Sequence, residues 1–573
     1  MKIVRVDLST KKIRVEAVPE RYRELGGRGL TSLMVNEEVP PGCDALGREN
    51  LLVFAPGFLS GTSLPNTGRL SVGAKSPLTG GIKESNAGGT AATAIARLGI
   101  TAIVLEGQAP EGELSFLRID RNGEASLEPG GELAGERNYA LVEKMLARYG
   151  PKTAVLSIGP AGESRLPSAS IQSSDVDGHP CRAAGRGGLG AVMGAKGLKA
   201  LVVDQRGGSP DPVADPQTFR KAVKEVIGFI KADHMCAEVM PKLGTAGLVA
   251  PVNSMGAFPS YNARQGVLPG WEAISGEALA ELLQKRGGQP THTGCSQCMI
   301  HCSNVFVDEQ GRYVTGSLEY ETIWSMGGMT GVRDLDTIAR LDRLCDDIGL
   351  DTMNTGVAVA VALDSGYRSF GDARAVLEMV EEIGRGTELG RILGSGPVAV
   401  GRHFGNPRVP AVKGQGVAAY DPRAMLGHGV TFATSPMGAD HTAGNLVGAY
   451  LTGALDPLKK EGQVDTSRFL QIAMAAFDTA GQCFMASVAL LSPEAGEAFR
   501  RLLSAKFGRE FGPDSFPGEL GRRVLRAEKD FNRRAGFSKE DDRLPRFYYE
   551  EPLPPHNTVF SIGDEELDST LDF

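Results

Sequence analysis

The stretch RAAGRGGLGAVMGAKGLKA, residues 182–200, combines closely spaced glycines with short apolar runs, and it limits the folds that this chain can adopt. It contains G-x-G-x-x-G at Gly185, Gly187 and Gly190, the spacing of dinucleotide-binding turns. That motif has its usual meaning only between a buried strand and a helix, and the preceding SSDVDGHPCRA predicts no buried strand. We therefore reject a Rossmann fold and interpret the glycines as backbone that lets a bulky ligand approach closely.

Composition excludes several classes of function. The chain has 573 residues, 75 of them glycine, and a net charge of −8. This length predicts two to four domains, and an acidic balance without a stripe of Lys and Arg argues against a nucleic-acid partner. The longest apolar run near the N-terminus, LLVFAPGFLSG at 51–61, is short and contains Pro and Gly, so no membrane insertion is expected. Sparse cysteines and the lack of a charged-then-apolar leader predict a reducing, cytoplasmic location.

Periodicity divides the chain into three parts and predicts an α+β fold. Residues 1–207 are predicted to form a β-rich domain, with a hairpin at 1–18 and strand-like runs in NLLVFAP, RLSVGAK, TAIVLEG, LSFLRI, TAVLSI and KALVVD. The Gly- and Pro-rich stretch 205–217 is predicted to be a linker. Residues 208–415 and 416–573 are predicted to form two mainly helical domains, and the acidic end GDEELDSTLDF a loosely held tail.

Four cysteines have the arrangement of iron–sulfur ligands. Cys295, Cys298 and Cys302 give the spacing C-x2-C-x3-C in HTGCSQCMIHC, and Cys483 follows far downstream in FDTAGQC. A cubane [4Fe–4S] cluster binds four thiolates, and a tight triplet with one remote cysteine is a common source of them. The chain is therefore expected to transfer electrons.

A structural zinc site is the alternative reading of the triplet. His292, His301 or Cys302 could complete a tetrahedron around Cys295 and Cys298. Zinc sites usually pair two short knuckles, whereas here the triplet has no second knuckle near it, and the other part of the proposed site is a single distant cysteine. The cluster is therefore favoured over zinc.

A short pattern occurs twice, as DDIGLD at 346–351 and DTAGQC at 478–483, in the form D-x-x-G-x-[D/C]. Each copy is predicted to end an apolar helix, where a left-handed glycine is the ordinary explanation. The second copy, however, ends in the proposed fourth cluster ligand. A buried carboxylate beside a helix end needs hydrogen-bond donors, and a ligand rich in N–H groups, such as a pterin, could supply them.

Nearly the whole chain resembles the tungsten-containing aldehyde ferredoxin oxidoreductases. The resemblance rests on motifs in the same order along the chain, which are GGRGL (26–30), GRLSVGAKSPLTG (68–80), SNAGG (85–89), SIGPAGE (157–163), the stretch 182–200, the cysteine triplet, EYETIW (319–324), DDIGLDTMNTG (346–356), AYDPR (419–423) and D-x-x-G-x-C. It implies a base domain of two β-sheets covered by two helical domains, with the cofactor buried between them.

The resemblance also implies the cofactors and the residues that bind them. The expected cofactors are a tungsten bis-pterin, in which molybdenum is possible, a Mg²⁺ ion that bridges the pterin phosphates, and a [4Fe–4S] cluster beside one pterin. Arg suits phosphate through paired hydrogen bonds, and glycine backbone allows close approach. The residues implied to contact pterins or phosphates are Arg69, Asn86, Gly88, Arg182, Ala183 and Gly185, and those implied to hold the pterin rings are Asp346, Leu350, Asp351, Asp478 and Gln482.

Two catalytic residues follow from the same resemblance. Glu321 in EYET matches a glutamate beside the metal, and His441 in SPMGADHTAG matches a histidine near the substrate. Otherwise Glu321 would be a solvated helix residue and His441 a satisfied core histidine. Aldehyde oxidation needs a base for water or the hydrate and a donor that polarises the carbonyl. Glu321 is the candidate base and His441 the candidate donor.

The chain departs from the family pattern at three places. Residues 437–441 read MGADH where Arg-Gly-(Ala/Gly)-Cys-His is usual, and Gln482 replaces a usual Leu. Some members join two subunits through an iron held by E-x-x-H, but Arg340 and Arg343 stand at those positions. Arginine offers no lone pair to a metal, and two cations facing a partner would repel. We therefore expect no bridging iron, and any oligomer to use another surface.

The sequence thus predicts an oxidoreductase that interconverts aldehydes and carboxylic acids. Electrons would pass through the cluster to ferredoxin or to a ferredoxin-like iron–sulfur subunit. One alternative is the tungsten subunit of a benzoyl-CoA-type aromatic ring reductase, and another is a non-catalytic homologue that only conducts electrons. Retention of Glu321, His441 and both D-x-x-G motifs argues against the non-catalytic alternative.

Overall fold

A computed structural model describes residues 1–209 and 212–573, so part of the predicted linker, 210–211, lies outside the described residues. The N-terminal region contains two six-stranded sheets. The first has the order β2-β1-β6-β3-β4-β5, and its strands are β1 (Lys2–Asp7), β2 (Lys12–Ala17), β3 (Leu52–Pro56), β4 (Leu70–Lys75), β5 (Ile82–Ala87) and β6 (Ile100–Glu106). The second has the order β11-β10-β9-β12-β7-β8, and its strands are β7 (Ser115–Ile119), β8 (Ala125–Pro129), β9 (Thr153–Ser157), β10 (Ile171–Ser173), β11 (Arg182–Ala184) and β12 (Leu198–Asp204).

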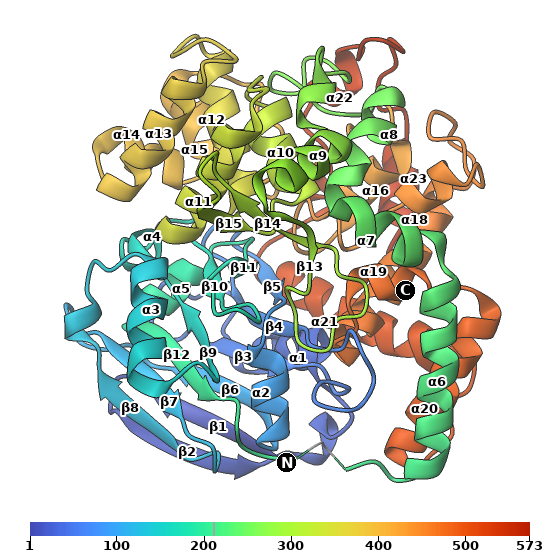
Figure 1. The fold of residues 1–573 in the computed structure, drawn as a ribbon. Helices are drawn as coiled ribbons and strands as arrows, with labels where there is room; N and C mark the ends of the chain where they lie inside the picture. Colours follow the sequence, from blue (N-terminus) through green and yellow to red (C-terminus); the bar gives the residue numbers. More distant parts are fainter. Residues whose placement is uncertain (210–211) are drawn as a thin grey trace.

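The two sheets share one apolar core, which includes Val4, Leu70 and Ile103 from the first sheet and Leu156 and Leu201 from the second. The predicted hairpin is confirmed as β1 and β2, and the six strand-like runs are confirmed as β3, β4, β6, β7, β9 and β12. The edge strands β5 and β11 lie in contact with each other (Figure 1). β11 pairs antiparallel with β10, so the glycine-rich stretch that follows it lacks the parallel-strand context of a Rossmann turn.

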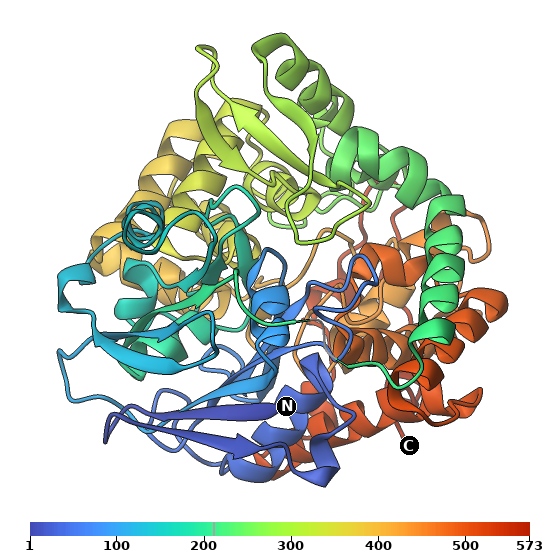
Figure 2. The ribbon, with the colours of Figure 1, turned by 60° about the horizontal axis from the view of Figure 1, so that its bottom comes forward.

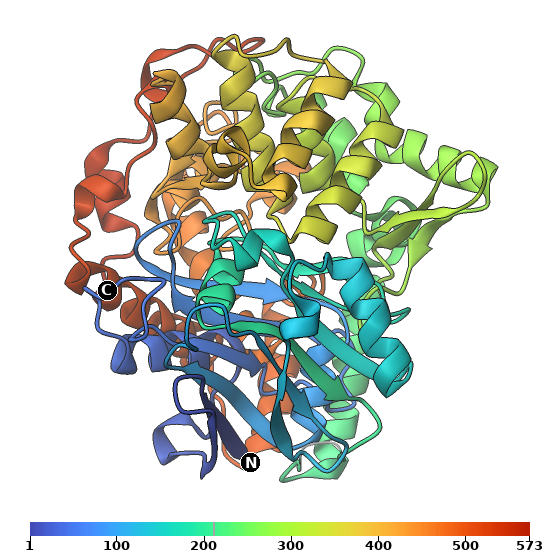
Figure 3. The same ribbon diagram turned by 90° about the vertical axis from the view of Figure 1, so that its left-hand side faces the viewer.

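Most of the remaining chain is helical and covers the sheets (Figure 3). Helices α11 (Leu335–Ile348), α12 (Thr352–Asp364), α13 (Ala373–Arg385), α14 (Glu388–Gly394) and α15 (Pro397–Phe404) pack together above them. A small sheet of β13 (Gln289–His292), β14 (Ser303–Val307) and β15 (Tyr313–Gly316) precedes this group. No described helix has both the length and the apolar character needed to cross a bilayer.

The C-terminal helices return to the N-terminal region, so that three groups of elements surround a common centre (Figure 2). These helices include α16 (Leu426–Thr434), α18 (Gln463–Ala480), α19 (Phe484–Val488), α20 (Pro493–Phe507) and α21 (Leu520–Arg534). α18 and α21 pack against α1 (Gly27–Glu38), and α20 packs along α6 (Pro216–Ala232). The predicted loose tail is wrong: α23 (Asp564–Ser569) buries Leu567, and Arg468 donates to the carbonyl of Thr570 at 2.7 Å.

A buried ion pair joins the two ends of the chain. The Nε and Nη2 atoms of Arg28 on α1 each donate to a carboxylate oxygen of Glu528 on α21 at 2.9 Å, and the side chains are 3% and 0% exposed. Ser32 also donates to Glu528 at 2.8 Å. Such a pair contributes little net stability over an apolar one, but loss of one partner leaves the other charge buried and unpaired.

We expect Glu528→Ala to lower the free energy of unfolding by about 3–5 kcal/mol, because the buried Arg28 guanidinium then loses the carboxylate that binds two of its nitrogens and keeps only the 3.4 Å contact with Asp478. Asp530→Ala on the same helix is the control, since Asp530 is 40% exposed and pairs with Arg533 and Arg534 at the surface. That variant should lose at most about 1 kcal/mol. Denaturant unfolding measures both, and equal losses would contradict a special role for the buried pair.

Candidate active site

The four predicted cluster cysteines converge from two distant segments. Cys295, Cys298 and Cys302 lie in the loop between β13 and β14, and Cys483 lies just before α19. Asn66 connects the two segments: its carbonyl accepts from the N–H of Cys483 at 2.7 Å, and its N–H donates to the carbonyl of Gln297 at 3.1 Å. Its side-chain amide also donates to the Cys298 Sγ at 3.5 Å. Sequence reasoning missed Asn66, because an Asn in a loop ordinarily indicates only a turn.

The cysteine sulfur atoms do not form a group tight enough for tetrahedral zinc. Of the His, Cys, Asp and Glu side chains in the described residues, only Asp175, Asp177 and His292 bring three ligand atoms within 4.8 Å of one another. No three of the four cysteine sulfurs are therefore that close. Tetrahedral zinc with Zn–S bonds of about 2.3 Å would hold them about 3.8 Å apart, whereas a cubane binds each thiolate through a different iron. The arrangement therefore disfavours a tetrahedral zinc site, and the cluster stays a prediction.

Gly88 places the cysteines beside two of the predicted pterin-site arginines. A Cβ atom at Gly88 would lie 2.6 Å from the Cys295 Sγ, 3.0 Å from Nη1 of Arg69 and 3.8 Å from Cδ of Arg182. Arg69 in turn donates to the side chain and the carbonyl of Asn86. Any side chain at position 88 would fill this junction, so glycine is needed there for Cys295 to lie beside the two arginines.

The first D-x-x-G motif forms a turn with unsatisfied polar groups. α11 ends at Gly349, which has φ +82°, and Asp346 on its last turn is 6% exposed. Its Oδ2 atom is buried without a hydrogen-bond partner, and burial raises the pKa of the carboxyl well above its usual range. Leu350 is buried, and the carboxylate of Asp351 accepts from Nε of Arg186 at 3.3 Å.

The second motif has the same form, and its turn also carries buried polar atoms without hydrogen-bond partners. α18 ends at Gly481, with φ +78°, and both side-chain polar atoms of Gln482 are buried without partners. Burial raises the pKa of Asp478 to about 7, although Nη1 of Arg28 lies 3.4 Å from its Oδ2 atom. Nε of Arg182 is likewise buried and unpartnered. Buried polar groups are normally satisfied. The unpartnered Oδ2 of Asp346, the amide of Gln482 and Nε of Arg182, whose Nη1 already pairs with Glu319 at 3.2 Å, therefore fit a polar, N–H-rich and anionic ligand such as a pterin phosphate.

Two further predicted residues belong to the edge strand β11 and the turn after it. Ala183 pairs with Gln172 in the ladder with β10. A Cβ atom at Gly185 would meet only the Ala183 Cβ, at 3.8 Å, so the backbone there borders open space. Arg186, the next residue, was missed by the sequence analysis although it lies within the same glycine-rich stretch. Its guanidinium donates to the carbonyls of Ala439 and Gly416 and so reaches the loop that carries His441.

Glu321 and His441 face each other across the site. Oε1 of Glu321 lies 3.5 Å from Nε2 of His441, and Oε2 accepts from the N–H of Ala419 at 3.1 Å. Oε1 of Glu321 and Nδ1 of His441 have no hydrogen-bond partner. Burial raises the pKa of Glu321 to about 8 and lowers the pKa of His441 to about 4. Burial thus favours the protonated form of the carboxyl and the neutral form of the imidazole.

An aromatic wall encloses this pair. The rings of Tyr420 and His428 stack with centroids 4.3 Å apart, and the ring of Tyr420 lies 6.3 Å from that of His441. The Tyr320 hydroxyl donates to the carbonyl of Ala419 at 2.8 Å, which fixes the backbone that holds Glu321. Such a wall excludes water and strengthens the electrostatic interactions within the site.

The two arginines at the family's iron-binding positions do not both face outward. Arg340 is exposed, but the guanidinium carbon of Arg343 lies 3.3 Å from the centroid of the Tyr139 ring. Arg343 also donates to the carbonyl of Val314 at 2.8 Å. Arg343 thus has partners within its own chain, whereas Arg340 is exposed, and the expected lack of a bridging iron stays a prediction.

Comparison with known proteins identifies the family. Sequence models for the aldehyde ferredoxin oxidoreductases match residues 3–205 (N-terminal domain) and 221–572 (domains 2 and 3). The tungsten-containing aldehyde ferredoxin oxidoreductase of Pyrococcus furiosus is 33% identical over 579 residues, and that of Thermococcus kodakarensis 34%. Each alignment covers 96% of this chain and 92% of the relative.

A solved structure has the same fold at lower identity. The active site complex BamBC of benzoyl coenzyme A reductase, in complex with 1,5 dienoyl-CoA, superposes with a TM-score of 0.83 at 22% identity, covering 100% of this chain and 93% of that one. It confirms the α+β fold with its two-sheet N-terminal region. Together with the matches along the sequence, this shows that the chain belongs to the aldehyde ferredoxin oxidoreductase family.

Proposed function

We propose that this protein is a tungsten-pterin oxidoreductase that interconverts aldehydes and carboxylic acids and passes electrons through a [4Fe–4S] cluster. The observation that carries the proposal is the pair Glu321 and His441, whose side chains are 15% and 17% exposed and whose facing atoms lie 3.5 Å apart, while each side chain keeps an unpartnered polar atom. Relatives at 33% and 34% identity bear the name of aldehyde ferredoxin oxidoreductases, which supports the aldehyde as substrate class.

The residues of the chain provide the proton chemistry and the binding groups. When bound, the metal–pterin centre would accept the two electrons released from the aldehyde. The Glu321 carboxylate would take the proton from water or from the aldehyde hydrate, and the N–H of His441 would donate to the carbonyl oxygen. Arg69, Arg182 and Asn86 would bind pterin or phosphate groups together with Mg²⁺, and Asp346 and Gln482 would bind the pterin rings. The wall formed by Tyr420 and His428 would keep bulk water from the reacting carbon.

The position of the cysteines supports an electron path out of the protein. Cys295 adjoins Gly88, Arg69 and Arg182 on the proposed cofactor side, and all four cysteines are only partly buried. A cluster in this place would lie between the pterin site and the surface, where ferredoxin or a ferredoxin-like iron–sulfur subunit could accept single electrons.

One assay separates this proposal from the ring-reductase alternative. Purified protein with its tungsten, iron and phosphorus contents measured is incubated with acetaldehyde or benzaldehyde and oxidised viologen. Viologen reduction with stoichiometric formation of the acid supports the proposal. Loaded protein that reduces no viologen with any aldehyde, but oxidises a reduced viologen when given an aromatic acyl-CoA, would contradict it.

The pKa of Glu321 predicts the pH dependence of the reaction. Because burial raises this pKa to about 8, the carboxylate form increases as the pH rises through 8. Aldehyde oxidation, which needs the carboxylate as a base, should therefore rise through this range, and acid reduction, which needs the protonated form, should fall. Initial rates with viologen between pH 6 and 9 measure both directions. A flat oxidation profile over this range would contradict Glu321 as the base.

A further inference from the structure

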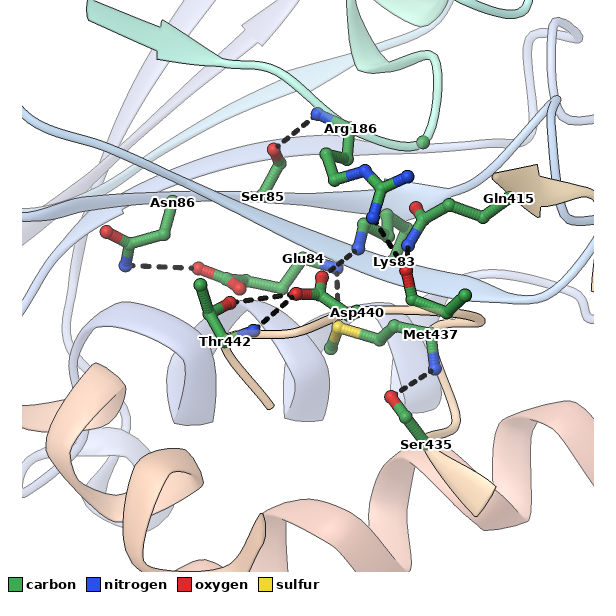
Figure 4. Close-up of polar contacts among 12 residues, drawn as sticks. Lys83, Glu84, Ser85, Asn86, Arg186, Gln415, Ser435, Met437, Asp440 and Thr442 are labelled. Carbon is green, nitrogen blue, oxygen red and sulfur yellow. Dashed lines mark hydrogen bonds and ion pairs between the residues drawn. The ribbon is translucent and has the colours of Figure 1, made fainter. Parts of the chain in front are cut away.

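The loop that carries His441 is fastened to the N-terminal sheet by a buried ion pair (Figure 4). Nζ of Lys83, on edge strand β5, lies 2.8 Å from Oδ2 of Asp440, and the side chains are 0% and 13% exposed. The other oxygen of Asp440 accepts from the N–H and the hydroxyl of Thr442 at 3.1 and 2.8 Å. The carboxylate thus connects β5 with the residues on both sides of His441.

A second set of contacts holds the backbone of the loop just before Asp440. The carbonyl of Ala439 accepts from Nη1 of Arg186 at 2.6 Å and from Nε2 of Gln415 at 2.9 Å. Met437 lies upstream in the same loop, and its Sδ accepts from the N–H of Glu84 on β5 at 3.4 Å (Figure 4). Nδ1 of His441, by contrast, has no partner. The position of the imidazole is therefore set by the anchored backbone and not by hydrogen bonds from a neighbour to its Nδ1 atom.

We infer that Lys83 and Asp440 are a positioning pair, which fastens the loop 435–446 to β5 and so fixes His441 opposite Glu321. The inference rests on the proposed function in one respect, namely that His441 acts on the substrate. Neither residue touches the reacting atoms. The pair acts through the backbone, and its loss would let the imidazole move away from the Glu321 carboxyl. A displacement of about 1 Å in such a group can cost about 10²-fold in rate.

Asp440 also places a negative charge near Glu321, so its loss should change the pH profile as well as the rate. The charged or titratable groups around Glu321 are Asp440 and His441 on the loop, Asp351 at the start of α12, Arg186 after β11, and the phenols of Tyr320 and Tyr420. Asp440 and Asp351 raise the pKa of Glu321, whereas Arg186 and the N–H of Ala419 lower it. Replacing Asp440 by a neutral amide should therefore move the rising limb of the pH profile to lower pH.

The experiment is a double-mutant cycle on the loaded holoenzyme with Asp440→Asn, Lys83→Met and both together. Asp440→Asn should lower kcat by about 10²-fold and move the rising part of the pH profile to lower pH. The double variant should lose no more than this, because the two changes remove the same interaction. It also leaves no buried charge unpaired, so it tests the inference even where a single variant fails to fold. The matched control is Lys199→Met with Glu163→Gln, which removes an equally buried lysine–carboxylate pair between β12 and Pro160–Glu163 and should keep kcat.

Hydrogen exchange of the loop is the readout that does not depend on activity. Peptides from 435–446 should exchange faster in the double variant than in the control variant or the parent protein. Additive losses in the cycle, unchanged exchange, or an equal loss of kcat in the control variant would overturn the inference. A parent enzyme that oxidises no aldehyde would overturn the proposed function instead, and the exchange measurement would still decide whether Lys83 and Asp440 hold the loop.

Discussion

Glu321→Gln is expected to lose aldehyde oxidation by about 10²- to 10⁴-fold while keeping its tungsten and iron content, because removal of a positioned base costs this much. The amide retains the shape of the side chain, and its oxygen can still accept from the N–H of Ala419. It cannot take up a proton at neutral pH. Steady-state rates with viologen, together with elemental analysis of the same preparation, measure the effect.

The control for this variant is another buried carboxylate in the helical region. Asp364 at the end of α12 is 3% exposed and pairs with Arg264, away from His441. Asp364→Asn should keep its turnover, so that a loss in Glu321→Gln cannot be attributed to a missing buried charge in general. If Glu321→Gln oxidised aldehydes at the normal rate, the base would be another group.

Cys483→Ser should abolish or alter the [4Fe–4S] EPR signal of the reduced protein and lower its iron content. A serine hydroxyl is a hard and weakly acidic ligand, whereas iron–sulfur clusters are held by soft thiolates. The substitution changes one atom and leaves the contact between Asn66 and the backbone of residue 483 in place, so the loop should keep its course. EPR spectra and iron analysis of the purified variant give the readout.

Cys236 provides a demanding control, because its thiol lies in the same neighbourhood. Its pKa is raised by burial and further by the nearby Asp233, Cys483 and Cys298, and its S–H donates to the carbonyl of Met485 at 3.2 Å. It is thus a protonated thiol with a partner of its own. Cys236→Ser and Cys43→Ser should leave the EPR signal intact. An unchanged signal in Cys483→Ser, or a loss in Cys236→Ser, would show that the ligand set is wrong.

Local sequence patterns were sufficient for much of the fold but not for its polar connections. The apolar runs predicted six strands and the hairpin, because alternating and continuous apolar patterns depend on neighbours in the chain. β5 was missed, since IKESNA is polar although every residue of it except Asn86 is buried. Its buried Lys83 is explained only by Asp440, which is 357 residues away. The acidic C-terminal segment was wrongly predicted to be loosely held, because its buried Leu567 follows directly after three acidic residues.

In the candidate site, too, the sequence reveals local patterns but not contacts between residues far apart in the chain. The cysteine spacing and the two D-x-x-G motifs named the cluster ligands and Asp346, which are all local patterns. Arg28 and Glu528 are 500 residues apart, and neither has a neighbour in the sequence that reveals the pair. The domain limits 207/208 and 415/416 and the roles of the cofactor residues stay predictions, which the variants above can test in part.

The contact of Asn66 with both halves of the cysteine site has a consequence for how the protein is assembled. Asn66 is made early in synthesis, the triplet in the middle and Cys483 near the end, so the full ligand set exists only after most of the chain has left the ribosome. A cluster inserted there would act as an inorganic cross-link that closes very long loops, a constraint that chiefly penalises the unfolded chain. Insertion of the cluster would therefore also stabilise the folded chain against unfolding.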